Sequence, residues 1–133
     1  MQNAPSEWTS MMPFAKLVGF EVSAASATEV RGTIEWRPEL CTTNGILHGA
    51  ALMALADSLG AICAFLNVPP GAGTATIESK TNFFRAVRSG TVDATARPLH
   101  VGKSTIVVQT DLLDSDGRRV AQVTQTQAVL PAG

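Results

Sequence analysis

The chain has 133 residues, of which 45% are hydrophobic and 16% charged, with ten Lys and Arg against eleven Asp and Glu. This length and apolar content fit one domain, residues 1–133, that folds without a disulfide or a metal, and they exclude a disordered chain. A net charge of −1 argues against a nucleic-acid-binding surface, which needs a cluster of basic residues. With only Cys41 and Cys63 and no secretory signal in the opening residues, we expect a cytoplasmic protein.

The first third of the chain predicts short elements only. Residues 1–12 are polar and contain Pro5, so we expect a loose N-terminal arm there. Residues 14–19 predict one helical turn that ends at a glycine. Strands are expected at residues 20–25 and 29–37, the second of which alternates apolar and polar residues with a period of two.

One long helix is predicted over about residues 48–67. Its segment Gly49–Leu66 is almost wholly apolar and reaches the length at which a membrane span becomes possible. Asp57 lies near its middle and no basic residue flanks it, which argues against a span. A helix that is apolar on all sides is otherwise one buried inside a protein, and that is the structure we expect.

Four strand-like segments joined by short links follow the helix, at residues 74–84, 91–100, 105–113 and 119–130. Such a succession favours an antiparallel sheet, and the sheet must wrap the apolar helix. The sequence therefore predicts an α+β fold. Because one sheet covers only one side of a helix, the remaining apolar surface predicts a homodimer at least.

Several motifs, in order along the chain, resemble the hotdog-fold acyl-CoA thioesterases of the phenylacetate-degradation (PaaI-like) type. Asn44–Gly49 followed by Asp57 looks like the N-x-x-x-H-G-(x)7-D signature of that family. Residues 12–19, 76–85, 101–104 and 116–121 resemble its opening turn, central strand, strand-joining loop and last hairpin. The resemblance implies a sheet of five or six strands around one helix, hydrolysis of a short-chain or aromatic acyl-CoA to the acid and CoA, no metal or cofactor, and a homotetramer.

Asp57 is the only acidic residue between Glu39 and Glu78, in a helix almost free of charge. Besides a carboxylate that faces solvent, it fits a general base for water or a direct nucleophile. Gly49 starts the helix, where free backbone N–H groups can stabilise an oxyanion. Eight residues, about 12 Å of helix, separate the two. If both act on one carbonyl group, they must come from different subunits.

The resemblance gives supporting roles to three further residues, each of which also fits a purely structural role. His48 would hold the loop or order water, Asn44 would orient water or substrate, and Thr76 would position water. Basic and small residues at strand ends are expected to bind CoA, namely Arg85, Arg88, Gly102, Lys103 and Ser104. The residues expected to line the acyl pocket are Leu52, Met53, Phe83 and Phe84.

Other chemistry is less well supported. Cys41 and Cys63 have no recognisable histidine partner, and no Cys or His cluster has metal-ligand spacing. An enoyl-thioester hydratase and a non-catalytic acyl-CoA sensor or carrier are alternatives on the same fold. The arrangement of Asn44, His48 and Asp57 fits hydrolysis better than hydration.

Overall fold

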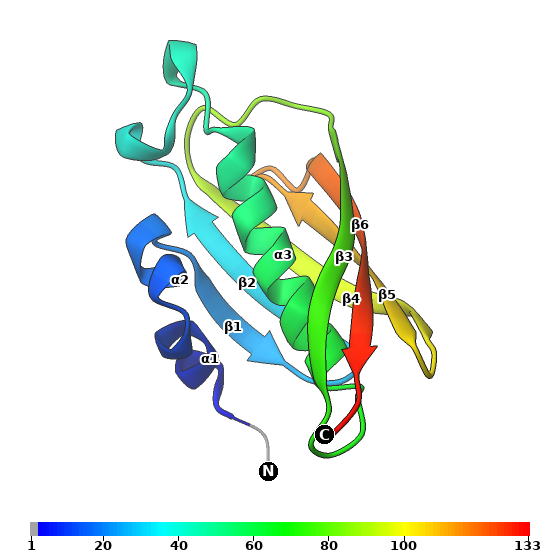
Figure 1. The fold of residues 1–133 in the computed structure, drawn as a ribbon. Coiled ribbons are helices and arrows are strands. Elements are labelled where there is room, and N and C mark those ends of the chain that lie inside the picture. Colours follow the sequence, from blue (N-terminus) through cyan, green and yellow to red (C-terminus); the bar gives the residue numbers. More distant parts are fainter. Residues whose placement is uncertain (1–2) are drawn as a thin grey trace.

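The computed structural model describes residues 3–133 (Figure 1). In this range the α-helices are α1 (Pro5–Met11), α2 (Pro13–Val18) and α3 (Gly49–Phe65), with short 3-10 helices at Pro38–Leu40 and Thr43–Gly45. The strands are β1 (Glu21–Ala25), β2 (Val30–Glu35), β3 (Gly73–Phe83), β4 (Thr91–Val101), β5 (Thr105–Leu113) and β6 (Arg119–Leu130). The expected long helix and all six expected strands are confirmed.

The six strands form one antiparallel sheet in the order β1-β2-β4-β5-β6-β3. The four strands after the helix join one antiparallel sheet, as expected, but β3 is out of chain order in it. That strand does not pair with β4. It crosses to the far edge of the sheet and pairs with β6, from Gly73 opposite Leu130 to Phe83 opposite Ala121. β3 is therefore an edge strand, and its side away from β6 pairs with no other strand of residues 3–133.

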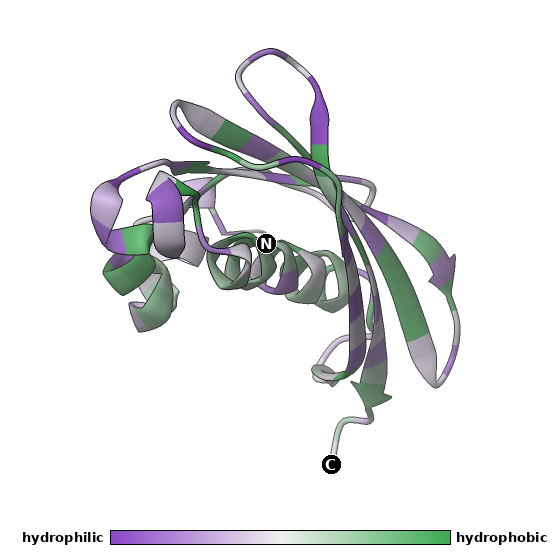
Figure 2. Ribbon diagram, turned by 90° about the horizontal axis from the view of Figure 1, so that it is seen from above, coloured by the Kyte–Doolittle hydropathy of each residue, from purple (hydrophilic) through white to green (hydrophobic). Residues whose placement is uncertain are grey.

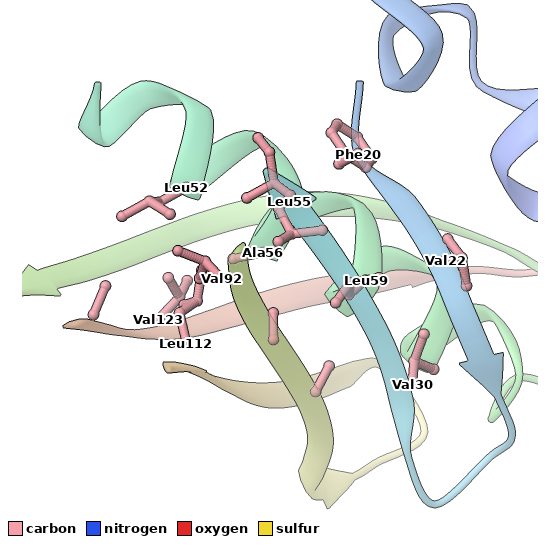
Figure 3. Packing of buried hydrophobic residues seen from close by; sticks show 14 of the residues in the cluster. Phe20, Val22, Val30, Leu52, Leu55, Ala56, Leu59, Val92, Leu112 and Val123 are labelled. Atoms are coloured by element: carbon pink, nitrogen blue, oxygen red, sulfur yellow. The ribbon is translucent and has the colours of Figure 1, made fainter. Parts of the chain in front are cut away.

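The core lies between α3 and the concave face of the sheet, which curves over one side of the helix (Figure 2). Leu52, Leu55 and Leu59 of α3 are buried here with residues of β4, β5 and β6 such as Val92 and Val123 (Figure 3). Burying side chains of this size contributes about 1.5–3 kcal/mol each. No helix within residues 3–133 is long and apolar enough to cross a membrane.

A stripe of α3 is left uncovered by the sheet. Ala50, Met53, Asp57 and Phe65 are exposed, at intervals of three, four and eight residues that keep them on one side of the helix. Apart from Asp57 these residues are apolar. The structure thus agrees with the expectation that one sheet cannot cover the whole helix.

The expectation of a loose N-terminal arm is wrong for residues 5–11, which form α1. Pro5 takes the first helical position, where a missing N–H costs nothing, and Glu7 accepts a hydrogen bond from the Ala4 backbone N–H. Trp8 is buried and its ring meets that of Phe65 edge-on, with centroids 6.0 Å apart. This contact brings Trp8 to the C-terminal end of α3, while α1 as a whole packs mainly against β1.

Candidate active site

The N-terminus of α3 presents one free backbone donor. Nδ1 of His48 accepts a hydrogen bond from the Ala50 N–H at 3.0 Å, so this imidazole caps the helix. The backbone N–H of His48 donates to the Leu40 carbonyl oxygen. The Gly49 N–H has no partner among residues 3–133. The helix start therefore has a donor, at its positive end, that could stabilise a developing oxyanion.

A cavity of about 480 Å³ adjoins this donor. Three of the four expected acyl-pocket residues line it, namely Leu52, Phe83 and Phe84, whereas exposed Met53 does not. Gly49 has no side chain, and the Phe83 ring packs in the space beside it, since a Cβ on Gly49 would lie 2.8 Å from the Cζ atom of Phe83.

Asp57 lies two turns further along α3 and is held by a chain of hydrogen bonds. Its Oδ1 accepts from the Thr76 hydroxyl at 3.0 Å and from the Gln125 side-chain amide at 3.1 Å. Gln127 in turn donates to the Thr76 hydroxyl oxygen at 2.7 Å. No group within residues 3–133 donates to Oδ2 of Asp57. The structure thus brings Thr76 to Asp57, and it adds two glutamines that sequence reasoning missed.

A second cavity, of about 400 Å³, lies beside Asp57. Its walls come from α1, α3 and the start of β3, and they include Trp8, Met11, Met12 and Phe65. None of these residues was expected in the site, and Trp8, Met11 and Met12 lie in the segment that was expected to be a loose arm. The lone tryptophan of this polar segment was one available signal. The result is a mostly apolar chamber next to a carboxylate.

Asn44 does not join the cavity beside Gly49. It occupies the left-handed region, with φ of 63°, a conformation that asparagine tolerates better than most residues. Its carbonyl oxygen accepts a hydrogen bond from Arg88 at 3.2 Å, and the next carbonyl, of Gly45, accepts from Trp36. Thr42 lines the cavity instead. Asn44 and Arg88 therefore shape the loop before α3.

The residues expected to bind CoA fall into two groups. Arg85 lines the cavity beside Gly49, and Arg88 anchors the adjoining loop. Gly102, Lys103 and Ser104 form the β4–β5 turn at the opposite end of the sheet (Figure 1). Within one chain the two groups do not meet.

The cysteines do not join the site. Cys63 is fully buried in α3, and this burial raises the pKa of its thiol to about 11. A thiol with that pKa stays protonated near neutral pH and is a poor nucleophile. Cys41 is half-buried before α3, where its thiol donates to the Arg37 carbonyl.

Asp57 and Gly49 therefore open into separate cavities that share no lining residue. Each cavity contains one of the two groups that hydrolysis of a carbonyl compound requires. Within residues 3–133, the cavity beside Asp57 has a carboxylate with one free oxygen, and the cavity beside Gly49 has an unpaired backbone donor. One chain alone does not bring the two parts together.

Comparison with known proteins identifies the family. The model of the thioesterase superfamily matches residues 44–121, which is more than half of the chain and includes α3, β3, β4 and β5. The chain belongs to the thioesterase superfamily. This confirms the expected hotdog fold and the expected class of enzyme, a thioester hydrolase.

Individual relatives agree with this assignment. The 1,4-dihydroxy-2-naphthoyl-CoA hydrolase of Escherichia coli is 33% identical over 86 residues, 65% of this chain and 63% of that protein. The proofreading thioesterase EntH of Cronobacter sakazakii has the same identity and coverage. The chain thus spans less than two thirds of either relative. The structure of a Pseudomonas aeruginosa thioesterase superposes with a TM-score of 0.91 at 27% identity, covering 98% of this chain and 96% of that one.

Proposed function

We propose that this member of the thioesterase superfamily hydrolyses an aromatic or short-chain acyl-CoA to the free acid and CoA. Asp57 acts as general base or nucleophile, and the Gly49 N–H of a second copy of the chain stabilises the oxyanion. The observation that carries this proposal is the separation of the two groups. Among the residues that the structure describes, one Asp57 oxygen and the Gly49 N–H have no partner, and the two groups face different cavities.

The exposed edge of β3 supports a homodimer that joins them. Suppose two β3 strands pair in antiparallel fashion about an axis near their midpoint, Glu78. Phe83 of the second copy, with Gly49 packed against its ring, then lies opposite Gly73 of the first copy. Thr76, which bonds Asp57, is three residues further along the same strand, about 10 Å away. Such pairing satisfies the free backbone groups of an eleven-residue edge strand.

The chemistry follows from these positions. As a base, Oδ2 of Asp57 takes a proton from water while the water oxygen attacks the thioester carbonyl carbon. The oxyanion is stabilised by the Gly49 N–H, then collapses and breaks the carbon–sulfur bond. The proton on Asp57 passes to the departing CoA thiolate. As a nucleophile, Asp57 instead attacks the carbonyl carbon itself, the carbon–sulfur bond breaks and CoA leaves as the thiolate, so that a mixed anhydride remains. Water then hydrolyses the anhydride to the free acid and the Asp57 carboxylate, and the proton that is released neutralises the thiolate. Neither route calls for a metal or a cofactor.

The cavity beside Asp57 supports an aromatic acyl group. Trp8 and Phe65 provide aromatic walls, and Met11 and Met12 are side chains that adapt to different ligand shapes. The E. coli relative is named for an aromatic acyl-CoA, which agrees with this choice. We further propose that Arg85 and Lys103 bind CoA phosphates. The PaaI-like subtype, a homotetramer and a cytoplasmic location, the last supported by two free cysteines, complete the proposal.

Free-thiol release tests the proposal. Wild type and Asp57→Asn are compared on phenylacetyl-, benzoyl-, short-chain and long-chain acyl-CoA, with circular dichroism to show that both are folded. We expect turnover on aromatic or short acyl groups and a collapse in the variant. Equal turnover would remove Asp57 from the mechanism. Binding of acyl-CoA without turnover in either protein would point to a carrier.

A further inference from the structure

We propose that Gln125 and Gln127 of β6 are positioning residues that hold one oxygen of Asp57 and leave the other free to react. This inference rests on the proposed role of Asp57. Neither glutamine was expected in the site, and neither faces solvent, with exposed fractions of 0% and 1%. They act on the reaction through Asp57 and Thr76, and not by touching the substrate.

The burial of these two amides is unfavourable for stability. Each side-chain Oε1 is buried without a hydrogen-bond partner among residues 3–133. A buried polar atom left unpaired destabilises a fold, and apolar residues of the same shape would fill this space at no such cost. Stability alone therefore does not account for two glutamines at neighbouring inward positions of β6.

The direction of the hydrogen bonds is set by the carboxylate. Ionised Asp57 can only accept, so both Thr76 and Gln125 must donate to its Oδ1. Thr76 has one hydroxyl proton and uses it on Asp57. Gln127 must then present its NH₂ group to the Thr76 oxygen, at 2.7 Å. The whole chain of donors runs from the sheet toward a single oxygen atom.

This polarity gives the two oxygens of Asp57 different roles. Bonds to an ionised acceptor are the stronger kind, and a chain of donors strengthens each of its members. Oδ1 is therefore engaged and fixed. Oδ2 keeps its lone pairs, on a side chain that lines the apolar cavity. A base or a nucleophile needs such a free oxygen held in one orientation.

Gly60 makes room for this arrangement. It lies one helical turn after Asp57, and the Gln125 amide packs directly against its Cα, where any Cβ would overlap the amide. A glycine inside a helix lowers stability relative to alanine. The chain accepts this loss at the one position that lets Gln125 reach Asp57.

The test uses Gln125→Met and Gln127→Met, which keep the shape and remove the donors, with kcat, KM and melting temperature measured on the best acyl-CoA. We expect kcat to fall about 10- to 100-fold in each variant, since each loses or loosens a bond to a charged group, while KM stays near the wild-type value. The melting temperature should stay close to the wild-type value, because the lost hydrogen bond is offset by the removal of an unpaired buried oxygen. A merely structural role cannot lower kcat while leaving stability intact.

Two substitutions of exposed Thr76 form a matched pair of variants that does not require the core to repack. Thr76→Ser keeps the hydroxyl and should keep most of the turnover, whereas Thr76→Val removes the hydroxyl and should behave like Gln127→Met. If kcat keeps its wild-type value in both methionine variants and in Thr76→Val while Asp57→Asn is inactive, the positioning role of the two glutamines is refuted and the proposed function is not. If Asp57→Asn keeps the wild-type kcat, both the proposed function and the positioning role of the glutamines are refuted. If the methionine variants lose kcat and melting temperature together, the positioning role of the glutamines is also refuted.

Discussion

Gly60→Ala should destabilise the protein, although the same change in most helices stabilises it. The gain from replacing a helical glycine is about 1 kcal/mol. Against it stands the Gln125 amide. A Cβ on Gly60 would overlap its Oε1 and Cδ, and even the more distant Nε2 would be only 2.8 Å away. Gln125 has no exposed surface, so it cannot move aside into solvent.

The size of the effect follows from what must give way. Forcing an extra methyl group into a packed core costs about 1–3 kcal/mol. Displacing Gln125 also removes its bond to the Asp57 carboxylate, which is worth about 1.5–3 kcal/mol. After the gain from helix propensity, the free energy of unfolding should fall by about 1.5–5 kcal/mol. For a chain of this length the melting temperature should drop by about 4 °C for each kcal/mol.

A double-mutant cycle in urea, at one fixed protein concentration, gives the decisive measurement. Gln125→Ala removes the amide that the added methyl group would overlap, so Gly60→Ala should cost much less in that background than in the wild type. The coupling energy should exceed about 1 kcal/mol, as expected for residues in contact. Additive effects, or a Gly60→Ala variant that melts above the wild type, would refute the packing argument.

Two solution properties follow from the titrating groups. With a thiol reagent at pH 8, the folded protein should react at Cys41 but not at Cys63, whose buried thiol has a pKa of about 11, and a second equivalent should react only in denaturant. A second rapid equivalent in the native state would contradict that burial. The pKa of Asp114 lies below its usual 3.8, chiefly because the Arg118 backbone N–H donates to it, so its stabilising effect is full at neutral pH and is lost as the pH falls through the lowered pKa. Asp114→Asn should therefore lower the melting temperature at pH 7 and make it less dependent on pH below about 4; an unchanged acid transition would contradict this.

Much of the fold was predictable because its signals are local. The apolar run that forms α3 ends at a Pro-Gly segment, and the strand ends are marked by turn residues. Helix α1 was missed because it has no apolar period, and Trp8 is its one buried residue. Pro5 followed by Glu7 was a helix-start signal that could have been used. The position of β3 at the far edge could not be inferred, since sequence patterns define strands but not their order.

The site, like the fold, has a part that was predictable from the sequence and a part that was not. Gly49, His48 and Asp57 lie on one helix, so their spacing was available from the sequence. The contacts that define their roles join distant parts of the chain, as when Gln125 packs on Gly60 or Phe83 on Gly49. A glutamine in an alternating strand predicts a solvent-facing position, and only the folded sheet shows Gln125 and Gln127 facing inward.

The pairing of β3 with β6 also bears on synthesis. As the chain leaves the ribosome, α3 and β3 emerge long before β6, which is the neighbour of β3 in the sheet and supplies part of the cover of α3. A nascent chain thus carries an apolar helix with no complete sheet to receive it until residues 119–130 are made. Contacts between segments so far apart in sequence form slowly. During this interval the α3 segment is the natural target for a chaperone that binds apolar surfaces.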